Sequence, residues 1–323
     1  MTSFEDIQKL ITKRLESLDF EIEPYNLYKP IEYSLSTGGK RIRPALTMMA
    51  YELFRYDIES AVNTAVGIEV FHNFTLLHDD IMDKSEMRRG QATVHNKWNP
   101  DIALLSGDAM SIMATSLINK SPRNQKEVMD AFTRAALDVC EGQQYDMDFE
   151  NAHNTTEDDY LKMISLKTGA LLAVSLKIGG LMADASKQDI ENLYKLGISL
   201  GIGFQLQDDW LDCYGNQEEF GKPIGKDILN KKKTFLWIEA MEKADSGQSK
   251  QLLDMMQNNN IADKEKIDNI LHVYKQLGIP QSTKNTVEAC FNEAISYLDK
   301  IKVTETQKTV LRQLLAKLKS RSH

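Results

Sequence analysis

Apolar residues recur at steps of three and four positions along nearly the whole chain, a period that indicates α-helices with one buried face. One such stripe covers residues 65–83 and a second covers residues 201–212. A third covers residues 161–172 and is interrupted at Lys167-Thr168. The alternation that is typical of strands is nearly absent. The spacing therefore predicts an all-α protein.

The content of turn residues agrees with a helical fold. Gly 17 and Pro 7 together make up about 7% of the 323 residues, against an average near 12%. From Ser249 onward the pattern predicts amphipathic helices with breaks near residues 258–260, 278–280 and 303–304. The chain has no clear repeat and no linker rich in Pro, Gly and Ser, so we expect a single domain over residues 1–323.

Charge and cysteine usage restrict the class of partner and the compartment. Lys+Arg 39 and Asp+Glu 47 give a net charge of −8 with no long basic run, so nucleic acid is not an expected partner. Three cysteines are too few for a disulfide framework and fit a reducing compartment. The N-terminus carries acids rather than an apolar core, and no run approaches the roughly 18 apolar residues of a membrane helix. We therefore expect a cytoplasmic protein without a membrane span.

Two acidic clusters share the pattern Leu-x-Asp-Asp-x-x-Asp, at residues 77–83 and 206–212. The aspartates that would share one helix face are Asp79 with Asp83 and Asp208 with Asp212. Carboxylates one turn apart repel each other unless a cation binds, and hard oxygen ligands of this kind suit Mg²⁺ together with substrate phosphates. A solvated acidic face is the alternative. Each cluster follows an apolar run, however, which favours a position that lines a cavity.

Three basic motifs accompany the acidic clusters. Residues 38–44, Gly-Gly-Lys-Arg-Ile-Arg-Pro, place three cations behind two glycines, and the arginine fork fits phosphate oxygens. Arg88-Arg89-Gly90 follows the first cluster, and residues 221–227 with Lys232 and Thr234 follow the second. The P-loop spacing is absent from the sequence, which argues against a nucleoside triphosphatase. The motifs predict two phosphate-binding ends, with an ordinary basic surface turn as the alternative for each.

His72 lies seven residues before Asp79 on the same helical stripe. A lone histidine on an apolar helix face is usually a core residue. Because this stripe leads directly to the expected metal ligands, a contact with substrate is the other interpretation.

Taken together, these motifs resemble those of the trans-isoprenyl diphosphate synthases, the polyprenyl synthetase family, and especially its short-chain geranylgeranyl and farnesyl diphosphate synthases. The matching segments, in family order, are residues 38–44, 79–83, 88–90, 142–146, 167–168, 204–212 and 221–232. The resemblance implies an antiparallel helical bundle around a deep central cavity, of the isoprenoid synthase type. It also implies a homodimer.

The resemblance further implies how substrates are held. The ligands of about three Mg²⁺ ions, for which Mn²⁺ can substitute, would be Asp79, Asp83, Asp208 and Asp212. The residues that would hold isopentenyl diphosphate are Lys40, Arg43, His72 and Arg89, with Arg41 shaping that pocket. The residues that would hold the allylic diphosphate are Arg88, Lys167, Lys222 and Lys232. Gln143 and Asp146 would lie behind the metals, and the loop length leaves open whether Lys222 or Lys226 reaches the phosphate.

The implied reaction is head-to-tail condensation of isopentenyl diphosphate with dimethylallyl, geranyl or farnesyl diphosphate. The catalytic set would be Lys167, Thr168, Gln205, Asp79 and Asp208. Oxygens of Thr168 and Gln205 would stabilise the allylic cation, and a proton would pass to the departed pyrophosphate. The alternatives are a longer-chain polyprenyl diphosphate synthase, a class I terpene cyclase and a non-catalytic subunit of a heteromeric synthase.

Product length is expected to depend on the helix before Asp79. Phe74 lies five residues earlier, and in the family a large aromatic residue at that place is associated with short products. At 100° per residue, Phe74 lies about 140° from Asp79, Phe71 about 80° and Thr75 about 40°. Phe71 therefore shares the role of floor in one interpretation, and both rings are ordinary core residues in the other. We expect a product of twenty carbons first and fifteen second.

Overall fold

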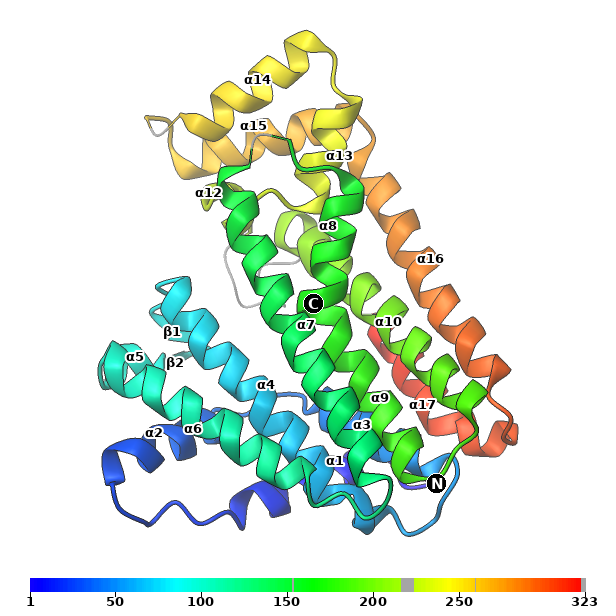
Figure 1. Ribbon diagram of the computed structural model, residues 1–323. Helices are drawn as coiled ribbons and strands as arrows, with labels where there is room; N and C mark the ends of the chain where they lie inside the picture. Colours follow the sequence, from blue (N-terminus) through cyan, green and yellow to red (C-terminus); the bar gives the residue numbers. More distant parts are fainter. Residues whose placement is uncertain (153, 216–223, 259, 321–323) are drawn as a thin grey trace. The chain divides into compact units, whose positions relative to one another are not determined.

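The computed structural model describes residues 1–152, 154–215, 224–258 and 260–320, and most of them lie in helices (Figure 1). The elements of the first part are α1 (Phe4–Glu16), α2 (Tyr25–Ser36), α3 (Ile42–Glu52), the 3-10 helix η1 (Ile58–Ala61), α4 (Val62–Met82), β1 (Met87–Arg88), β2 (Gln91–Ala92), α5 (Val94–Lys97), α6 (Pro100–Ile118) and α7 (Gln125–Asn151). Those that follow are α8 (Glu157–Ile164), η2 (Ser165–Gly169), α9 (Ala170–Met182), α10 (Lys187–Tyr214), α12 (Lys226–Leu229), α13 (Phe235–Lys243), α14 (Ser246–Gln257), α15 (Asp263–Gln276), α16 (Ile279–Lys300) and α17 (Glu305–Lys319). The predicted all-α class is confirmed, and in the described ranges the strands are confined to one short hairpin.

The chain divides into two compact units. Unit 1 comprises residues 1–134, 174–194 and 301–311, and unit 2 comprises residues 135–173, 195–300 and 312–323. The expectation of a single domain over the whole chain stays a prediction.

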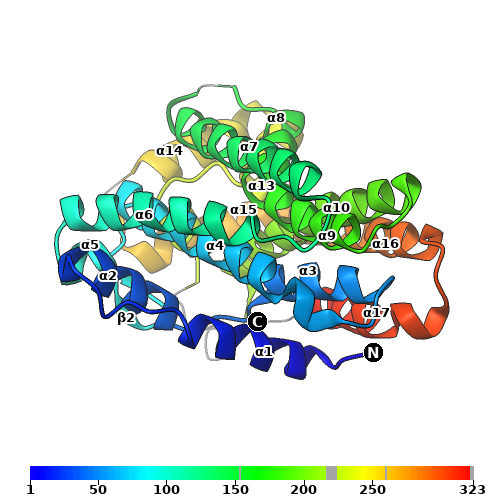
Figure 2. The ribbon, with the colours of Figure 1, turned by 60° about the horizontal axis from the view of Figure 1, so that its bottom comes forward.

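Unit 1 is built on α4 and α6, which lie side by side in both views (Figures 1 and 2). α3 also packs against α4, and α1 packs against α3 and α4. On α1 the buried side chains Ile7, Ile11 and Leu15 recur every four residues, so they form one face of the helix. α4 runs from Val62 to Met82 with Asp83 as its C-cap, as the stripe over residues 65–83 predicts.

Unit 2 has a separate core formed by α8, α10, α13, α14, α15 and α16. α10 approaches the segment after α8 very closely, because a Cβ added at Gly201 would lie 2.4 Å from the Cα of Gly169. The interruption expected at Lys167-Thr168 is a five-residue π-helix, η2, between α8 and α9. Single π-turns of this kind are rare and frequent at functional sites.

The predicted breaks between the last helices are confirmed. α14 ends at Gln257, α15 ends at Gln276, and α16 ends at Lys300, so each break lies at or beside an expected position. α14 begins with a capping box in which the Asp245 side chain accepts from the backbone of Gln248 and the Gln248 side chain accepts in return.

Two helical stretches are long and apolar enough to cross a membrane, residues 100–118 and 157–182. In the second, 67% of the most apolar 18-residue window is buried inside the protein, whereas in the first this share is 39%. The first stretch is α6, and it exposes Leu104, Leu105 and Ile112.

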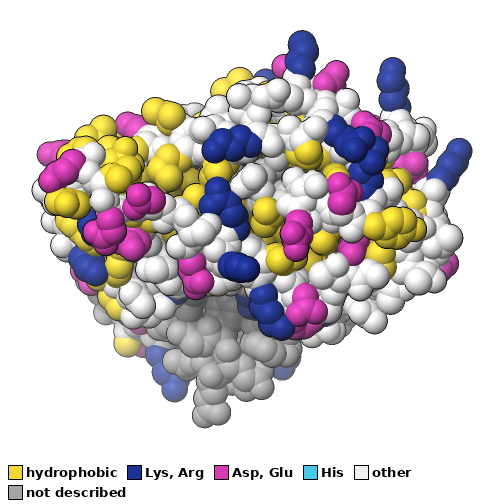
Figure 3. Space-filling model, turned by 90° about the horizontal axis from the view of Figure 1, so that it is seen from below, with side chains coloured by type: hydrophobic (Ala, Val, Ile, Leu, Met, Phe, Trp, Pro, Cys, Tyr) yellow, Lys and Arg dark blue, Asp and Glu magenta, His cyan; other side chains and the backbone are white. Residues whose placement is uncertain are grey.

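The charged side chains on one face of the molecule are mixed in sign. Figure 3 shows lysine and arginine side chains there interspersed with aspartate and glutamate, and with hydrophobic patches between them. This face therefore carries no large patch of a single sign of charge.

Candidate active site

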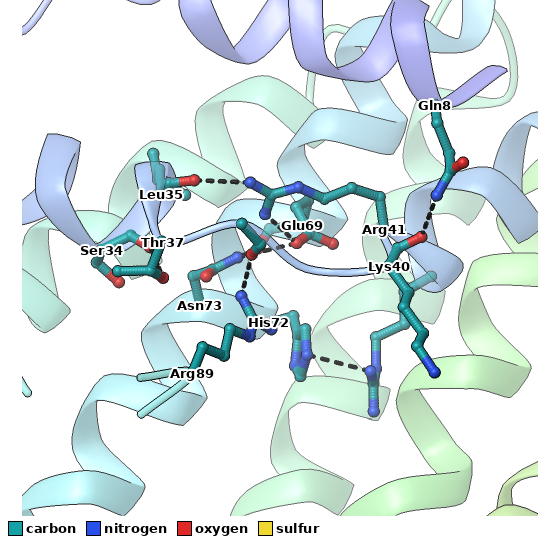
Figure 4. A network of polar contacts seen from close by, with 12 residues as sticks. Gln8, Ser34, Leu35, Thr37, Lys40, Arg41, Glu69, His72, Asn73 and Arg89 are labelled. Carbon is teal, nitrogen blue, oxygen red and sulfur yellow. Dashed lines mark hydrogen bonds and ion pairs between the residues drawn. The ribbon is translucent and has the colours of Figure 1, made fainter. Parts of the chain in front are cut away.

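The basic loop between α2 and α3 is held by a buried ion pair. Arg41 Nη1 donates to Glu69 Oε1 over 2.6 Å, and its Nη2 donates to the Leu35 carbonyl oxygen over 2.6 Å (Figure 4). The Asn73 amide donates to the same Glu69 carboxylate over 3.1 Å. Arg41 is also the N-cap of α3 with φ 50°, a left-handed conformation that costs energy for a residue with a Cβ. Arg41 therefore holds the loop from within, and its role in shaping the isopentenyl diphosphate pocket stays a prediction.

Arg89 reaches this loop from the β1–β2 hairpin. The last pair of the ladder, Arg88↔Gln91, leaves Arg89-Gly90 as a two-residue turn, and both have positive φ, 52° and 75°, as a type I′ turn requires. Arg89 Nη1 donates to the Gly38 carbonyl oxygen. A Cβ added at Gly39, which has φ +135°, would lie 2.8 Å from that nitrogen, so the loop needs glycine there.

Arg43 and His72 meet on the same side of the loop. Arg43 Nη1 lies 3.1 Å from His72 Nε2. A guanidinium can only donate, so Nε2 accepts and the ring carries its proton on Nδ1. Burial lowers the pKa of His72 well below its ordinary value, and the charges of Arg43 and Arg89 lower it further. The ring is therefore neutral at pH 7.

Lys40 completes the set of residues expected around isopentenyl diphosphate. Its backbone carbonyl accepts from the Gln8 amide over 2.7 Å, which ties the loop to α1, and its side chain is exposed (Figure 4). Unit 1 thus supplies all four residues of this set. They are Lys40 of the loop, Arg43 of α3, His72 of α4 and Arg89 of the hairpin.

The first acidic cluster lies at the C-terminal end of α4. Asp79 is half-buried and Asp83 is exposed, and the Asp83 N–H donates to the Asp79 carbonyl over 2.8 Å. The middle aspartate, Asp80, is buried and accepts from Arg88 Nε and Nη2, each over 2.8 Å. Asp80 therefore anchors the hairpin at Arg88, while Asp79 and Asp83 lie one turn apart at the end of α4.

The residues expected to set product length pack within unit 1. Phe71 is buried, with its ring centroid 5.1 Å from that of Phe132 and 5.3 Å from that of Phe74. Phe74 is half-buried, and its ring lies 4.7 Å from that of His78. The Thr75 hydroxyl donates to the His72 carbonyl over 2.8 Å, so it is satisfied by its own helix. The two phenylalanines form one aromatic cluster.

In unit 2 the π-helix η2 presents Lys167 and Thr168 on successive positions. Lys167 Nζ donates to Asp146 Oδ2 over 2.6 Å, and the Thr168 hydroxyl donates to Gln205 Oε1 over 3.0 Å. α7 can come this close only because residue 142 is glycine: a Cβ there would lie 2.3 Å from the Lys167 backbone nitrogen. Gln143, the next residue of α7, is half-buried.

The second acidic cluster lies near the end of α10. Asp208 is half-buried, whereas Asp212 is buried and its Oδ2 accepts from the Asp227 N–H over 3.0 Å. The middle aspartate, Asp209, accepts from the Tyr160 hydroxyl over 2.5 Å and from the Gln205 amide over 3.0 Å. Burial raises the pKa of Asp209 to about 7, and the nearby Asp227 charge raises it as well.

A pocket in unit 2 collects most of these groups. Lys167, Thr168, Gln205, Asp209 and Lys232 all line it. Lys233 also lines it, and its Nζ donates to the Phe149 carbonyl over 2.8 Å, at the end of α7. Lys226 is exposed at the start of α12, and Lys222 lies outside the described residues.

Comparison with known proteins identifies the family. A family model described as polyprenyl synthetase matches residues 24–274. The chain belongs to the polyprenyl synthetase family. It is a prenyltransferase. It is 42% identical over 258 residues to a short chain isoprenyl diphosphate synthase of Methanocaldococcus jannaschii, covering 78% of this chain and 79% of that protein.

Two further similarities agree with this family. A geranylgeranyl diphosphate synthase of Methanosarcina mazei is 41% identical over 223 residues, which are 68% of this chain and 69% of that protein. A crystal structure of a geranylgeranyl pyrophosphate synthase superimposes with a TM-score of 0.94 at 36% identity and covers 100% of both chains.

The acidic groups of this polyprenyl synthetase suit a hard divalent cation. Within the described ranges, groups of three or more His, Cys, Asp or Glu side chains close enough to hold a metal are absent. Each cluster instead offers a pair of carboxylates one turn apart, Asp79 with Asp83 and Asp208 with Asp212. That donor set fits Mg²⁺, which binds through one or two carboxylates and takes its other ligands from water and phosphate.

Sequence reasoning did not assign a role to the middle aspartate of either cluster. Asp80 is paired with Arg88, and Asp209 is paired with Tyr160. Both aspartates are the middle residue of their cluster, about 100° round the helix from the first. In the sequence, this offset indicates that each middle aspartate points in a different direction from the outer pair.

Proposed function

We propose that this prenyltransferase catalyses the Mg²⁺-dependent head-to-tail condensation of isopentenyl diphosphate with an allylic diphosphate and releases a short-chain trans-prenyl diphosphate. The observation that carries the proposal is the junction of Arg89 with Gly38 and Gly39. It adds a third cation to the loop that already holds Lys40 and Arg43. A second diphosphate-binding site of this kind is required for condensation, because the second substrate also carries a diphosphate.

The isopentenyl diphosphate site would use the neutral ring of His72 beside three cations. Arg43 and Arg89 present planar forks that match phosphate oxygens, and Lys40 adds an exposed ammonium group. The buried pair of Arg41 with Glu69 keeps the loop in place.

The allylic diphosphate would be bound by Lys167, Lys232 and Arg88, with Lys222 or Lys226 as a further contact. Asp79, Asp83, Asp208 and Asp212 would hold about three Mg²⁺ ions, or Mn²⁺ in their place, which when bound neutralise the charge of departing pyrophosphate. Asp146 on α7 accepts a hydrogen bond from the Lys167 ammonium group. Gln143 lies three residues before Asp146 on the same helix.

The chemical step would use oxygen atoms of Thr168 and Gln205. As the allylic carbon–oxygen bond breaks, positive charge develops on the allyl group, and oxygen dipoles fixed beside it stabilise that charge. The double bond of isopentenyl diphosphate attacks the allylic carbon and forms the new carbon–carbon bond. The proton lost from the adjacent carbon passes to pyrophosphate, which closes the balance of atoms and charge.

The product would be short because Phe71 and Phe74 limit the space along α4. Both rings belong to one aromatic cluster with Phe132, and Phe74 is the one that is only half-buried. We propose a chain of twenty carbons, with fifteen as the second product. A longer-chain synthase would need small residues at these positions.

The protein would act in the cytoplasm as a single-domain homodimer. The exposed fractions of Leu105 and Ile112 on α6 are 60% and 72%, and the two residues lie seven apart, so they share one face of the helix. A second copy of the chain would cover that face. Sedimentation should give the mass of a dimer, and Ile112→Glu should yield the monomer.

The three cysteines of the protein, Cys140, Cys213 and Cys290, are free thiols and fit the reducing cytoplasm.

Pyrophosphate release separates the proposed function from a terpene cyclase and from a non-catalytic subunit. The purified chain with Mg²⁺ should release pyrophosphate only when isopentenyl diphosphate and an allylic diphosphate are both present. A terpene cyclase would release it from an allylic diphosphate alone. A non-catalytic subunit would release none under either condition, and either of these outcomes would refute the proposal.

A further inference from the structure

A chain of three hydrogen bonds links a buried tyrosine to the hydroxyl of Thr168. The Tyr160 hydroxyl donates to Asp209 Oδ2 over 2.5 Å, and Asp209 Oδ1 accepts from Gln205 Nε2 over 3.0 Å. Gln205 Oε1 in turn accepts from the Thr168 hydroxyl over 3.0 Å. All four residues belong to unit 2, and all four line its pocket.

The hydrogen bonds of the chain give it a direction. Gln205 Nε2 donates to Asp209 Oδ1, so the nitrogen side of the Gln205 amide faces Asp209. The amide oxygen must then face Thr168, and the Thr168 proton is committed to it. The Thr168 oxygen keeps two lone pairs that can accept a hydrogen bond or stabilise positive charge. Without a fixed acceptor at Asp209, the Gln205 amide could turn over and the Thr168 hydroxyl could rotate.

Tyr160 occupies a rigid place at the far end of this chain. It is 4% exposed and lies in the first turns of α8, whose start is fixed by the capping box of Thr156 and Asp159. Its ring packs 6.5 Å from that of Phe235 in the core of unit 2. The Asp209 carboxylate is likewise 4% exposed, so the protein itself holds it in one orientation.

We propose that Tyr160 is a positioning residue for catalysis, which acts through Asp209 and Gln205 to fix the oxygen of Thr168 that faces the allylic cation. Tyr160 does not touch the reacting atoms in this scheme. The inference rests on the proposed function, because that function gives Thr168 and Gln205 their role.

The test compares two tyrosine-to-phenylalanine variants that each lose one buried Tyr–Asp hydrogen bond. Tyr160→Phe breaks the chain. Tyr51→Phe is the matched control, because Tyr51 is buried in unit 1 and its hydroxyl donates to Asp57 over 2.9 Å. The measurements are kcat, the KM values for both diphosphates, and the melting temperature. Tyr160→Phe should lower kcat by about 10- to 100-fold, the loss typical of a misplaced reactive group, with both KM values unchanged.

A double-mutant cycle with Thr168→Val shows whether Tyr160 acts through Thr168. In that background Tyr160→Phe should change kcat by less than about twofold, because the group that it positions is already gone. A merely structural tyrosine would give additive losses and would resemble Tyr51→Phe. Equal kcat values for the two single variants, or additive effects in the cycle, would overturn the inference. Because wild-type turnover is measured alongside, an inactive wild type would instead refute the proposed function.

Discussion

Arg43 Nη1 lies 3.1 Å from the Nε2 atom of His72, and this contact fixes the histidine as a neutral acceptor. Burial and the positive charges of Arg43 and Arg89 hold the pKa of His72 well below 6.5 in the folded protein. Protonation of His72, in the proposed isopentenyl diphosphate site, therefore affects how the free energy of unfolding depends on pH.

We predict that the folded protein loses stability as the pH falls below about 6.5, and that His72→Gln reduces this loss. The unfolded chain binds a proton at His72 in that range, whereas the folded protein does not, so the free energy of unfolding decreases toward acid. Melting temperatures between about pH 7 and pH 5 measure the effect. The control is His272→Gln, at an exposed position on α15, which should leave the slope unchanged. Parallel curves for wild type and His72→Gln would contradict the prediction.

Removing one carboxylate of an outer pair should abolish activity without loss of fold. Asp79→Ala should lower kcat by about 10²- to 10³-fold or more, because the charge of pyrophosphate would no longer be neutralised. Its melting temperature should hold or rise in the absence of metal, since two carboxylates one turn apart repel each other. Asp208→Ala should lose activity to the same extent. Asp254→Ala, at an exposed acid on α14, is the control and should remain active. Full wild-type activity in excess EDTA would show that no divalent cation is needed.

The two diphosphate sites should respond separately to mutation. Arg89→Ala should raise the KM for isopentenyl diphosphate by about tenfold or more, since it removes one charge-assisted contact, and should change the KM for the allylic substrate less. Lys167→Ala should do the reverse. Steady-state kinetics with each substrate varied in turn measure both effects, and each variant serves as the control for the other. If both variants weakened both substrates equally, two distinct sites would not exist.

Removing the phenylalanine rings of the aromatic cluster on α4 should increase the chain length of the product. Phe74→Ala removes the half-buried ring, and the double variant with Phe71→Ala removes the ring packed 5.3 Å from it. Both changes open space along the helix that carries Asp79. Phe74→Leu retains most of the volume and is the control. Chromatography of the dephosphorylated products measures the chain lengths, and an unchanged distribution in the double variant would show that these rings do not set the length.

The local structure of the site was largely predictable because its signals are local. The stripe over residues 65–83 became α4 with Asp83 as its C-cap, and the break at Lys167-Thr168 became a π-helix. Periodicity reports such features because each depends on neighbours three or four residues away. The type of the break was not predictable, since the backbone of the π-turn is approached closely by Gly142 and Gly201, which lie far from it in the sequence.

The supporting contacts were not predictable, because they join residues far apart in the sequence. Tyr160 and Asp209 are 49 positions apart, and Arg41 and Glu69 are 28 apart. The pair of Asp80 with Arg88 spans only 8 positions, but it exists because the turn at Arg89-Gly90 folds the hairpin back. Two adjacent residues with positive φ, one of them arginine, are not signalled by composition.

The most direct test of the whole account is the chain length of the wild-type product, measured by mass spectrometry. The purified protein is incubated with isopentenyl diphosphate, dimethylallyl diphosphate and Mg²⁺ until the allylic substrate is consumed. We predict a prenyl diphosphate of twenty carbons as the main product, with fifteen carbons second. Products of thirty or more carbons would contradict the role of the aromatic cluster, and the absence of any condensation product would contradict the proposed function itself.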